Sequence, residues 1–212
     1  MDKIKVLLVE DDVDWREILS SVLKNEADLF LVAAVSNRED ALSACILTDP
    51  DVVLMDIVLS ENNLDGIEAV VDIMAVRHPK IIMLTSLDKE VVIVEAFAAG
   101  AINYITKTHF SAIPGAIREA YANQVSIHFD ASHAVSKEIL RSSQEQFRNM
   151  LTPAEQDVLQ LLSKGHTQSH IQTLLHITES TIKKHVHKIL KKFGVVSGKD
   201  AVEKARKRGF FH

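Results

Sequence analysis

The segment Ile4-Lys5-Val6-Leu7-Leu8-Val9-Glu10-Asp11-Asp12 joins a short, mostly aliphatic run to three consecutive carboxylates. A run of this length and composition favours a buried strand. Because ligand-binding groups of open parallel sheets collect at the carboxyl ends of strands, we expect polar residues after such runs to share one crevice. Three further apolar runs lead to a polar residue in the same way, namely Val52–Met55 before Asp56, Ile81–Leu84 before Thr85, and Ala101–Ile105 before Lys107.

That crevice would hold several carboxylates, a hydroxyl group and an ammonium group. Carboxylates at close range repel one another, and a hard divalent cation such as Mg²⁺, which prefers oxygen ligands, would offset the repulsion. A lysine and a hydroxyl group beside the cation would suit a phosphoryl group. The pattern therefore predicts a site for a cation and a phosphate-like anion.

Residues 1–125 alternate between strand-like and helix-like patterns. Leu29–Val35 has the composition of a strand, Asn37 is placed to cap the helix that follows, and Phe110–Ala122 has the spacing of a fifth helix. Alternating units of this kind predict an α/β fold, with a five-stranded parallel sheet and helices on both of its faces.

Residues 149–212 have a different, all-helical pattern. Thr152, Pro153 and Glu155 have the order of a capping box at a helix start, and Thr178 is placed to cap a later helix. The sequence therefore predicts a small all-α domain at this end of the chain.

The intervening residues 126–148 are polar and only partly periodic, which predicts a linker that is helical in its later half. The expected organisation is thus an α/β domain at 1–125, a partly helical linker at 126–148 and an all-α domain at 149–212.

Charge is distributed unevenly between these parts. Residues 1–148 contain 13 Lys and Arg against 24 Asp and Glu, whereas residues 149–212 contain 11 against 5. An acidic first part and a basic second part suggest different partners, and a small basic domain points to nucleic acid.

The cellular compartment is predicted from three features that are missing from the sequence: a membrane span, a signal peptide and a pair of cysteines. No apolar run approaches the roughly 20 residues of a membrane span. The first residues have a strand pattern rather than that of a signal peptide, and Cys45 has no second cysteine to pair with. We expect a cytoplasmic protein with no membrane partner.

The helix expected after Thr178 has one basic side. Its apolar stripe leaves the opposite side to five lysines and a histidine, and we find no glutamate balancing them four residues earlier. Such a helix fits the major groove of double-stranded DNA, although a solvated lysine face is the ordinary alternative. The residues of the basic side are Lys183, Lys184, His187, Lys188, Lys191 and Lys192.

Five histidines of the second domain allow a second interpretation, a zinc site. Their spacing lacks the Cys/His pattern of zinc fingers, so we favour solvent exposure or DNA contact. They are His166, His170, His176, His185 and His187.

With these residues assigned, the first domain resembles the receiver domain of bacterial two-component response regulators over about residues 3–122. Asp12 precedes Asp56 by 44 residues, Thr85 by 73 and Lys107 by 95. The resemblance implies a flavodoxin-like fold in which Asp56 accepts a phosphoryl group from a histidine kinase.

The resemblance also implies the roles of the surrounding residues. Asp12 and Asp56 would hold Mg²⁺ directly, Asp11 would hold it through water, and the backbone carbonyl of Val58 would complete the protein ligands. The ordinary alternative for Asp11 and Asp12 is to cap the first helix.

Three further residues would contact or respond to the phosphoryl group. Lys107 would pair with its oxygens and Thr85 would hydrogen-bond one of them. Tyr104 resembles the aromatic switch residue of the family, whose ring would turn inward as Thr85 moves. The alternative for Thr85 and Tyr104 is ordinary strand packing.

The rim of the predicted site departs from the family pattern. The loop from Ile57 to Leu64 is two residues longer than usual and lacks its proline. Val58 and Leu87 stand where relatives often carry polar groups that orient hydrolytic water, so we expect a long-lived acyl phosphate.

The second domain resembles the LuxR-type helix-turn-helix domain that defines the NarL/FixJ group. The resemblance rests on Leu151–Glu155, Gly165 and Thr178–Val186. It implies that Lys183, Lys184 and His187 contact bases. The residues implied in phosphate contact are Lys188, Lys191, Lys192, Thr167, Ser180 and Thr181.

The predicted function is that of a phosphorylation-dependent DNA-binding transcriptional regulator, acting as a homodimer. One rival is an enzyme with an aspartyl-phosphate intermediate, but such enzymes usually place an acid two residues after the nucleophile, where this chain has Val58. A second rival is a constitutive DNA-binding protein whose first domain never receives phosphate.

Overall fold

The computed structural model describes residues 2–60, 64–86, 89–124 and 127–211. The chain forms two compact units, residues 1–136 and residues 137–212. Each unit has its own hydrophobic core.

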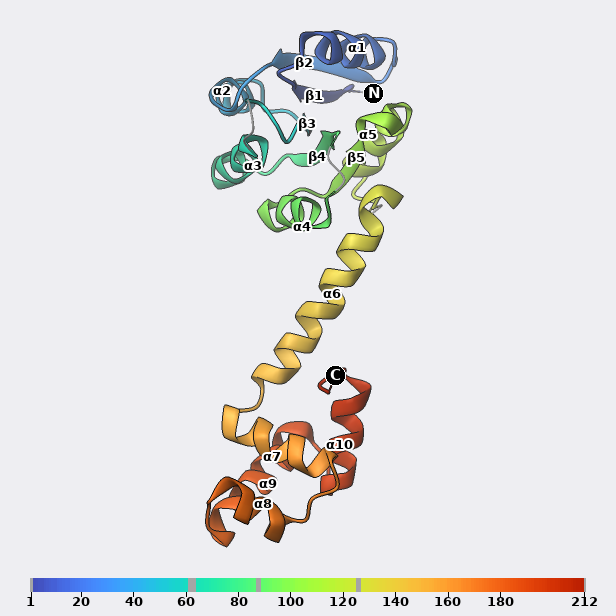
Figure 1. Cartoon of the computed structure of the whole chain (residues 1–212). Helices are drawn as coiled ribbons and strands as arrows, with labels where there is room; N and C mark the ends of the chain where they lie inside the picture. The colour runs from blue at the N-terminus through green and yellow to red at the C-terminus, as the bar shows by residue number, and fades with distance from the viewer. Residues whose placement is uncertain (1, 61–63, 87–88, 125–126, 212) are drawn as a thin grey trace. The chain divides into compact units, whose positions relative to one another are not determined.

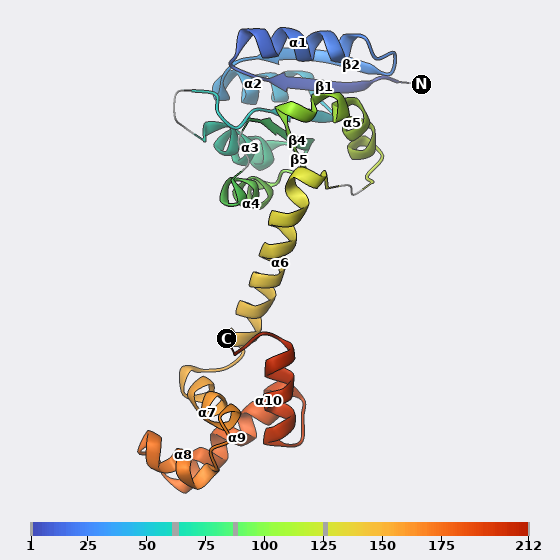
Figure 2. The same ribbon diagram turned by 45° about the vertical axis from the view of Figure 1, so that its right-hand side comes forward.

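The first unit is built on a five-stranded sheet in the order β2-β1-β3-β4-β5, with every neighbouring pair parallel. The pairing brings Val9 opposite Met55 and Thr85 opposite Thr106, so the residues that follow these strands emerge at one edge. The predicted parallel sheet is confirmed (Figures 1 and 2). The strands are β1 (Ile4–Val9), β2 (Leu29–Val35), β3 (Val52–Met55), β4 (Lys80–Thr85) and β5 (Asn103–Thr106).

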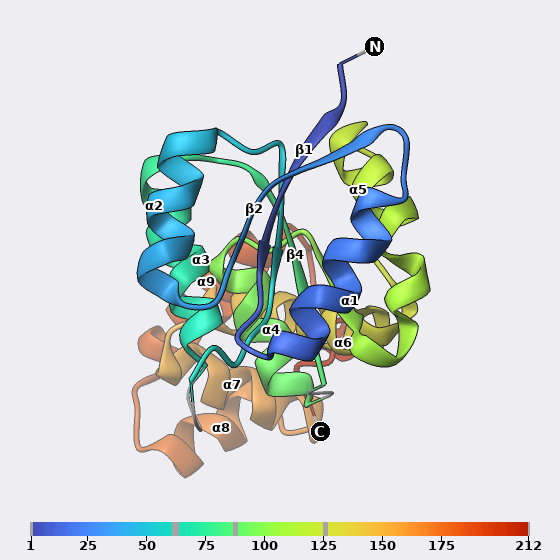
Figure 3. The same cartoon turned by 90° about the horizontal axis from the view of Figure 1, so that it is seen from above.

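Helices cover both faces of the sheet, as predicted. Seen from above, α1 and α5 lie on one side of the strands and α2 and α3 on the other (Figure 3). Each face buries its own cluster of aliphatic side chains, because strands buried on both faces have no solvated side. The helices are α1 (Val13–Lys24), α2 (Arg38–Thr48), α3 (Asp65–Val76), α4 (Glu90–Ala99) and α5 (Ile113–Tyr121).

The predicted fifth helix, Phe110–Ala122, is wrong at its start. A 3₁₀ helix, η1 (Lys107–Ala112), precedes α5, and His109 inside it has non-helical backbone angles. Pro114 stands in the first turn of α5, where its missing N–H costs no hydrogen bond, so the regular helix begins here.

A sixth helix, α6 (Phe129–Asn149), occupies most of the predicted linker and begins earlier than its expected later half. Residues 129–136 belong to the first unit, where Ala131 and Ala134 are buried in the same cluster as Tyr104. Later in the helix, Arg141 bridges Glu138 and Glu145 at helical spacing, which supports a polar helix.

The second unit packs four further helices, and the predicted N-caps are confirmed. The Thr152 hydroxyl accepts from the Glu155 amide and the Glu155 carboxylate accepts from the Thr152 amide, which completes the capping box. Thr167 and Thr178 cap the next two helices. The helices are α7 (Pro153–Ser163), α8 (Gln168–Leu175), α9 (Glu179–Phe193) and α10 (Gly198–Lys207).

Gly66 allows α3 to begin against the backbone of Asp56. A Cβ atom at this position would lie 1.9 Å from the Asp56 carbonyl oxygen and 2.8 Å from the Ile57 Cα, and neither backbone atom is free to move. The Gly66 amide donates to the Ile57 carbonyl at 2.9 Å. Glycine at this position therefore holds the end of β3 and the start of α3 together.

We predict that Gly66→Ala destabilises the first unit by about 1–3 kcal/mol or more through overpacking. Gly115→Ala is the matched control, because nothing lies within 4 Å of its added Cβ. That control should stabilise α5 by about 0.5–1 kcal/mol. Urea unfolding measures both, and equal effects of the two variants would contradict the packing argument.

Candidate functional site

Lys107 joins two buried carboxylates at the carboxyl edge of the sheet. Its Nζ donates to Asp56 Oδ2 and to Glu10 Oε1, each at 2.8 Å. The three side chains are between 1% and 8% exposed. Glu10, Asp56 and Lys107, which follow β1, β3 and β5, are therefore in direct contact, as expected for residues at the carboxyl ends of parallel strands.

The carboxylate of Asp56 is also held by the loop that follows it. Its Oδ1 accepts from the Ile57 amide at 2.6 Å and from the Val58 amide at 3.4 Å. Lys107 binds the other oxygen, so protein groups hold both oxygens of the side chain.

The charge balance of this cluster is uneven. Burial and the neighbouring Asp56 raise the pKa of Glu10 to about 7. Burial by itself would lower the pKa of Lys107, but its bonds to Asp56 and Glu10 outweigh burial and raise that pKa. Lys107 is therefore a firmly charged ammonium, whereas a negative charge on Glu10 is disfavoured.

One oxygen of Glu10 is an orphan. Lys107 Nζ lies 2.8 Å from both Glu10 oxygens, but the approach has hydrogen-bond geometry only toward Oε1. Oε2 is buried and has no hydrogen-bond partner among the described residues. A buried carboxylate oxygen without a hydrogen-bond donor is costly, and a divalent cation in addition to Lys107 would satisfy it.

Glu10, Asp11 and Asp56 could supply that cation site. One oxygen from each lies within 4.8 Å of the others, and no other three metal-ligating residues of the described chain come together in this way. The Arg16 guanidinium holds the backbone beneath them by donating to the carbonyls of Glu10 and Asp11. An all-oxygen set with an unsatisfied buried atom fits a hard divalent ion such as Mg²⁺.

The expectation that Asp12 is a direct metal ligand is corrected by this geometry. Asp12 lies outside the acidic group, and its Oδ1 accepts from the Trp15 amide at 3.0 Å as the N-cap of α1. Since Val9 pairs with Met55, the residue opposite Asp56 is Glu10. The capping alternative therefore describes Asp12, and Glu10 takes its place in the acidic group.

Thr85 and Tyr104 come from the two strands that complete this edge. Thr85 is the last residue of β4 and is buried, and Tyr104 in β5 is fully buried among apolar side chains. The ring of Tyr104 thus already lies inside the protein. Whether either residue moves remains a prediction.

The rim of the site is described only in part. Asp65 holds its near side by accepting from the Leu59 amide at 2.8 Å and the Ser60 hydroxyl at 2.6 Å. Val58 is partly buried. Leu87 and residues 61–63 lie outside the described residues, so the predicted long lifetime of an acyl phosphate stays a prediction.

Trp15 is a neighbour of the site that the sequence patterns did not reveal. Lys107 Nζ lies 5.5 Å from the centre of its ring. The indole belongs to α1, and its helical spacing in the sequence did not predict this contact. The chain contains one tryptophan, so this ring reports on the position of Lys107.

In the second unit, α9 presents the predicted basic side to solvent. Lys184, His187, Lys188 and Lys191 are exposed. Lys183 is exposed as well, but it pairs with Glu179 at 2.6 Å, four residues earlier. The statement that no glutamate balances this side is therefore wrong for Lys183.

The ammonium group of Lys192 forms an ion pair within the second unit. Its Nζ lies 2.6 Å from Oε2 of Glu155, whose side chain is 2% exposed and also accepts from the Thr152 amide. Burial alone would raise the pKa of Glu155, but its bond to Lys192 contributes to lowering it. Lys192 ties α9 to the capping box of α7, and its predicted contact with phosphate stays a prediction.

The three hydroxyl residues predicted to contact phosphate stand at helix starts. Thr167 Oγ1 accepts from the His170 amide at 3.3 Å as a cap. Ser180 and Thr181 Oγ atoms lie 3.0 and 2.8 Å from Thr178 Oγ1. They occupy the amino ends of α8 and α9, where backbone amides also suit a phosphate.

The histidines of the second unit form at most a pair in the described chain. His166 Nδ1 and His170 Nδ1 lie 3.1 Å apart, and no group of three metal ligands includes a histidine there. The solvent or DNA interpretation of these residues stays a prediction. Across the described residues, no helix is both long enough and apolar enough to cross a membrane.

The fold and the two sites define a phosphoacceptor-like α/β unit joined to a helix-turn-helix unit. Residues 6–118 match the family model of the response regulator receiver domain, and residues 149–205 match that of bacterial regulatory proteins of the luxR family. The chain belongs to the response regulators of two-component systems that carry a LuxR-type DNA-binding domain, and its function class is transcriptional regulation.

Relatives of similar length share this organisation. The response regulator protein VraR of Staphylococcus saprophyticus is 33% identical over 201 residues, which is 94% of each chain. The transcriptional regulatory protein LiaR of Bacillus subtilis is 32% identical over 195 residues, covering 91% of this chain and 92% of LiaR.

Solved structures resemble the whole chain. The response regulator ChrA of a heme-sensing two-component system is 25% identical, with a TM-score of 0.53 and full coverage of both chains. RcsB of Salmonella typhimurium, 17% identical, has a TM-score of 0.58 with 98% of this chain and 100% of RcsB covered, and it supports the fold alone.

We predict that Glu10→Gln stabilises the metal-free protein at pH 8 by on the order of 1–3 kcal/mol, because it removes a buried charge that burial and Asp56 disfavour. The same change should weaken Mg²⁺ binding. Saturating Mg²⁺ raises the stability of the wild type by about 2.7 kcal/mol at 100 times Kd, and thermal melts should show a smaller gain in Glu10→Gln.

Asp12→Asn is the matched control for this experiment, because asparagine also caps helices. Its gain in stability with Mg²⁺ should equal that of the wild type. A loss of Mg²⁺ response in Asp12→Asn, with retention in Glu10→Gln, would restore Asp12 as the ligand.

We predict that Lys192→Met lowers the stability of the second unit by about 1–3 kcal/mol, since it leaves a buried carboxylate short of a donor. Lys188→Met, on the exposed side of the same helix, should change stability by less than about 0.5 kcal/mol and should lower the salt dependence of DNA binding by about one phosphate contact. Equal stability of the two variants in urea would contradict the structural assignment of Lys192.

Proposed function

We propose that Asp56 accepts a phosphoryl group from the phosphohistidine of a sensor histidine kinase, and that this modification controls DNA binding by the second domain. The observation that carries the proposal is the Asp56 carboxylate held 2.8 Å from the Lys107 ammonium within a group of three carboxylates. The proposed domains are residues 1–125 and 149–212, joined by residues 126–148.

In the proposed transfer, an oxygen of Asp56 forms a bond to phosphorus as the bond between phosphorus and the imidazole nitrogen of the kinase breaks. The Ile57 and Val58 amides orient the carboxylate, and Lys107 neutralises charge on the phosphoryl oxygens. Thr85 would donate a hydrogen bond to one of these oxygens, and Tyr104 would follow its movement.

Glu10, Asp11 and Asp56 would hold Mg²⁺, with the Val58 carbonyl as a further ligand. When bound, the ion would offset the negative charge that gathers as two anions approach each other. The orphaned oxygen of Glu10 supports this assignment.

We propose double-stranded DNA as the ligand of α9 and the starts of α8 and α9. Lys183, Lys184 and His187 would contact base edges, since they lie near the amino end of the exposed side of α9. Phosphate contacts would come from Lys188, Lys191, Lys192, Thr167, Ser180 and Thr181.

A homodimer would place two such helices one DNA turn apart and would read a two-fold symmetric operator. Phosphorylation would shift an existing equilibrium toward the state that dimerises and binds DNA. We propose a cytoplasmic regulator rather than an enzyme, because the position two residues after Asp56 is the apolar Val58 and offers no acid for a catalytic cycle.

We predict that a small phosphodonor with Mg²⁺ adds one phosphoryl group to the wild type and raises its affinity for operator DNA by on the order of 10-fold, a common coupling between two sites. Asp56→Asn should abolish both effects because an amide is a poor nucleophile. Intact mass and fluorescence anisotropy with operator DNA measure the two effects. A wild type that binds operator DNA but gains no mass would support constitutive DNA binding instead, and a gain in mass without a gain in affinity would contradict control of DNA binding by Asp56.

A further inference from the structure

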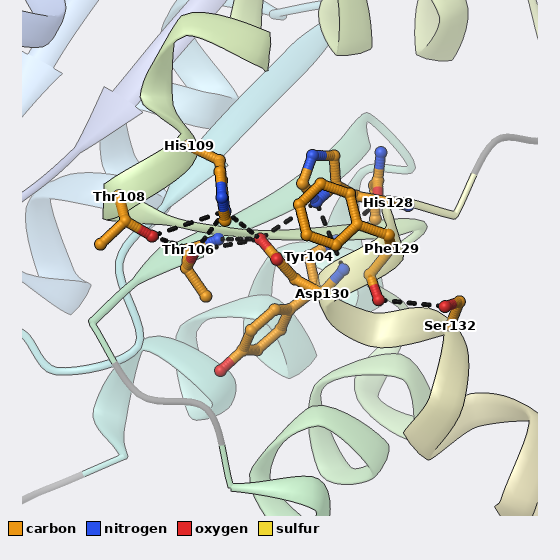
Figure 4. Close-up of polar contacts among 9 residues, drawn as sticks. Tyr104, Thr106, Thr108, His109, His128, Phe129, Asp130 and Ser132 are labelled. Atoms are coloured by element: carbon orange, nitrogen blue, oxygen red, sulfur yellow. Dashed lines mark hydrogen bonds and ion pairs between the residues drawn. The ribbon is translucent and has the colours of Figure 1, made fainter.

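Asp130, in the first turn of α6, lies in a polar cluster at the end of β5 (Figure 4). The amide and the hydroxyl of Thr106 donate to its Oδ2 at 2.9 and 3.0 Å. His109 Nδ1 and His128 Nδ1 lie 3.2 and 3.0 Å from the same oxygen. One carboxylate oxygen thus joins α6 to β5 and η1.

The carboxylate at the centre of this cluster is buried and charged, whereas the residues around it are partly exposed, with the His109 side chain 44% exposed. The Asp130 side chain is 7% exposed. Burial by itself would raise its pKa, but hydrogen bonds from Thr106 and His109 outweigh burial and lower it. The ring of Phe129 covers both histidines, with centres 4.8 Å from His109 and 4.2 Å from His128.

A second bond holds the segment that leads into α6. Asn103 Oδ1 accepts from the amides of Tyr104 and His128, each at 2.9 Å. The start of α6 is therefore attached to both ends of β5, the strand that leads directly to Lys107.

The residue that Asp130 holds is the one immediately before Lys107. The amide of Thr106 is fixed by α6, and the side chain of Lys107 is fixed by Asp56 and Glu10. One peptide unit and the Lys107 side chain are all that separate the two attachments. A displacement of the Thr106 backbone therefore moves the base of the Lys107 side chain directly.

We propose that Asp130 is a positioning residue for Lys107, so that the first turn of α6 forms part of the phosphoryl-transfer site. This inference rests on the proposed function of Asp56. Because coupling between sites is reciprocal, a change of charge at Asp56 alters the hold of Asp130 on β5 to the same extent. A change of charge at Asp56 would therefore reach α6 through the first turn of that helix.

Asp130→Ala in the full chain tests this role. The loss of the acceptor frees Thr106, and the resulting displacement of Lys107 should slow phosphorylation by a small phosphodonor with Mg²⁺ by on the order of 10-fold. It should also change the emission of Trp15, the only tryptophan, whose ring lies 5.5 Å from Lys107 Nζ. Asp130→Asn retains an oxygen that accepts from the Thr106 amide and should recover most of both signals.

His133→Ala is the matched control. His133 also joins α6 to the first unit, through Glu90 at 3.3 Å, but it does not contact β5 or η1. It should leave Trp15 emission and the phosphorylation rate unchanged. Equal effects of Asp130→Ala and His133→Ala, or no effect of Asp130→Ala on either signal, would overturn the proposal.

Two measures keep the test decisive. If Asp130→Ala does not fold, Thr106→Val removes the hydroxyl contacts of Thr106 with Asp130, Thr108 and His109 but keeps the bond from its amide to Asp130. It should change both signals in the same direction by a smaller amount. If the wild type takes up no phosphoryl group, the proposed function fails, whereas the Trp15 emission of the unphosphorylated variants still tests whether Asp130 positions Lys107.

Discussion

The Lys107 ammonium between two buried carboxylates is the interaction on which the first unit depends. Three acidic side chains meet at one edge of the sheet because parallel pairing brings the ends of β1 and β3 together. A single lysine, which directly follows the carboxyl end of β5, offsets only part of their charge. The remaining imbalance makes the crevice receptive to a cation and, with that cation, to an anion.

Glu155 is a second buried carboxylate, and its hydrogen bonds can be compared with those of Glu10. Glu155, like Glu10, pairs with a lysine and accepts from a backbone amide, but its pKa is lowered although burial opposes this. Glu10 keeps an oxygen without a donor among the described residues, and its pKa is raised. Glu155 is therefore a structural fastening of α7 to α9, whereas Glu10 retains capacity for a ligand.

The fold and the gathering of Asp56, Thr85 and Lys107 at one edge followed from local patterns and the strand-end rule. The choice between Glu10 and Asp12 did not, because both are acidic and a shift of one residue at the end of a strand is invisible without its pairing partner. Glu179 could have been found by counting four residues back from Lys183. The partners of Lys192 and Asp130 could not, since they are 37 and 24 residues away in the chain and meet only through tertiary packing.

Gly66 packs directly against the backbone of Asp56, and this contact constrains the loop that connects the two residues. Two sets of hydrogen bonds join the end of this segment to its beginning: the Gly66 amide donates to the Ile57 carbonyl, and the Asp65 carboxylate accepts from the Leu59 amide and the Ser60 hydroxyl. Residues can therefore be inserted farther along the segment without displacing the acceptor carboxylate. A loop two residues longer than the family pattern is therefore compatible with an acceptor carboxylate that is still held by Lys107 and the Ile57 amide.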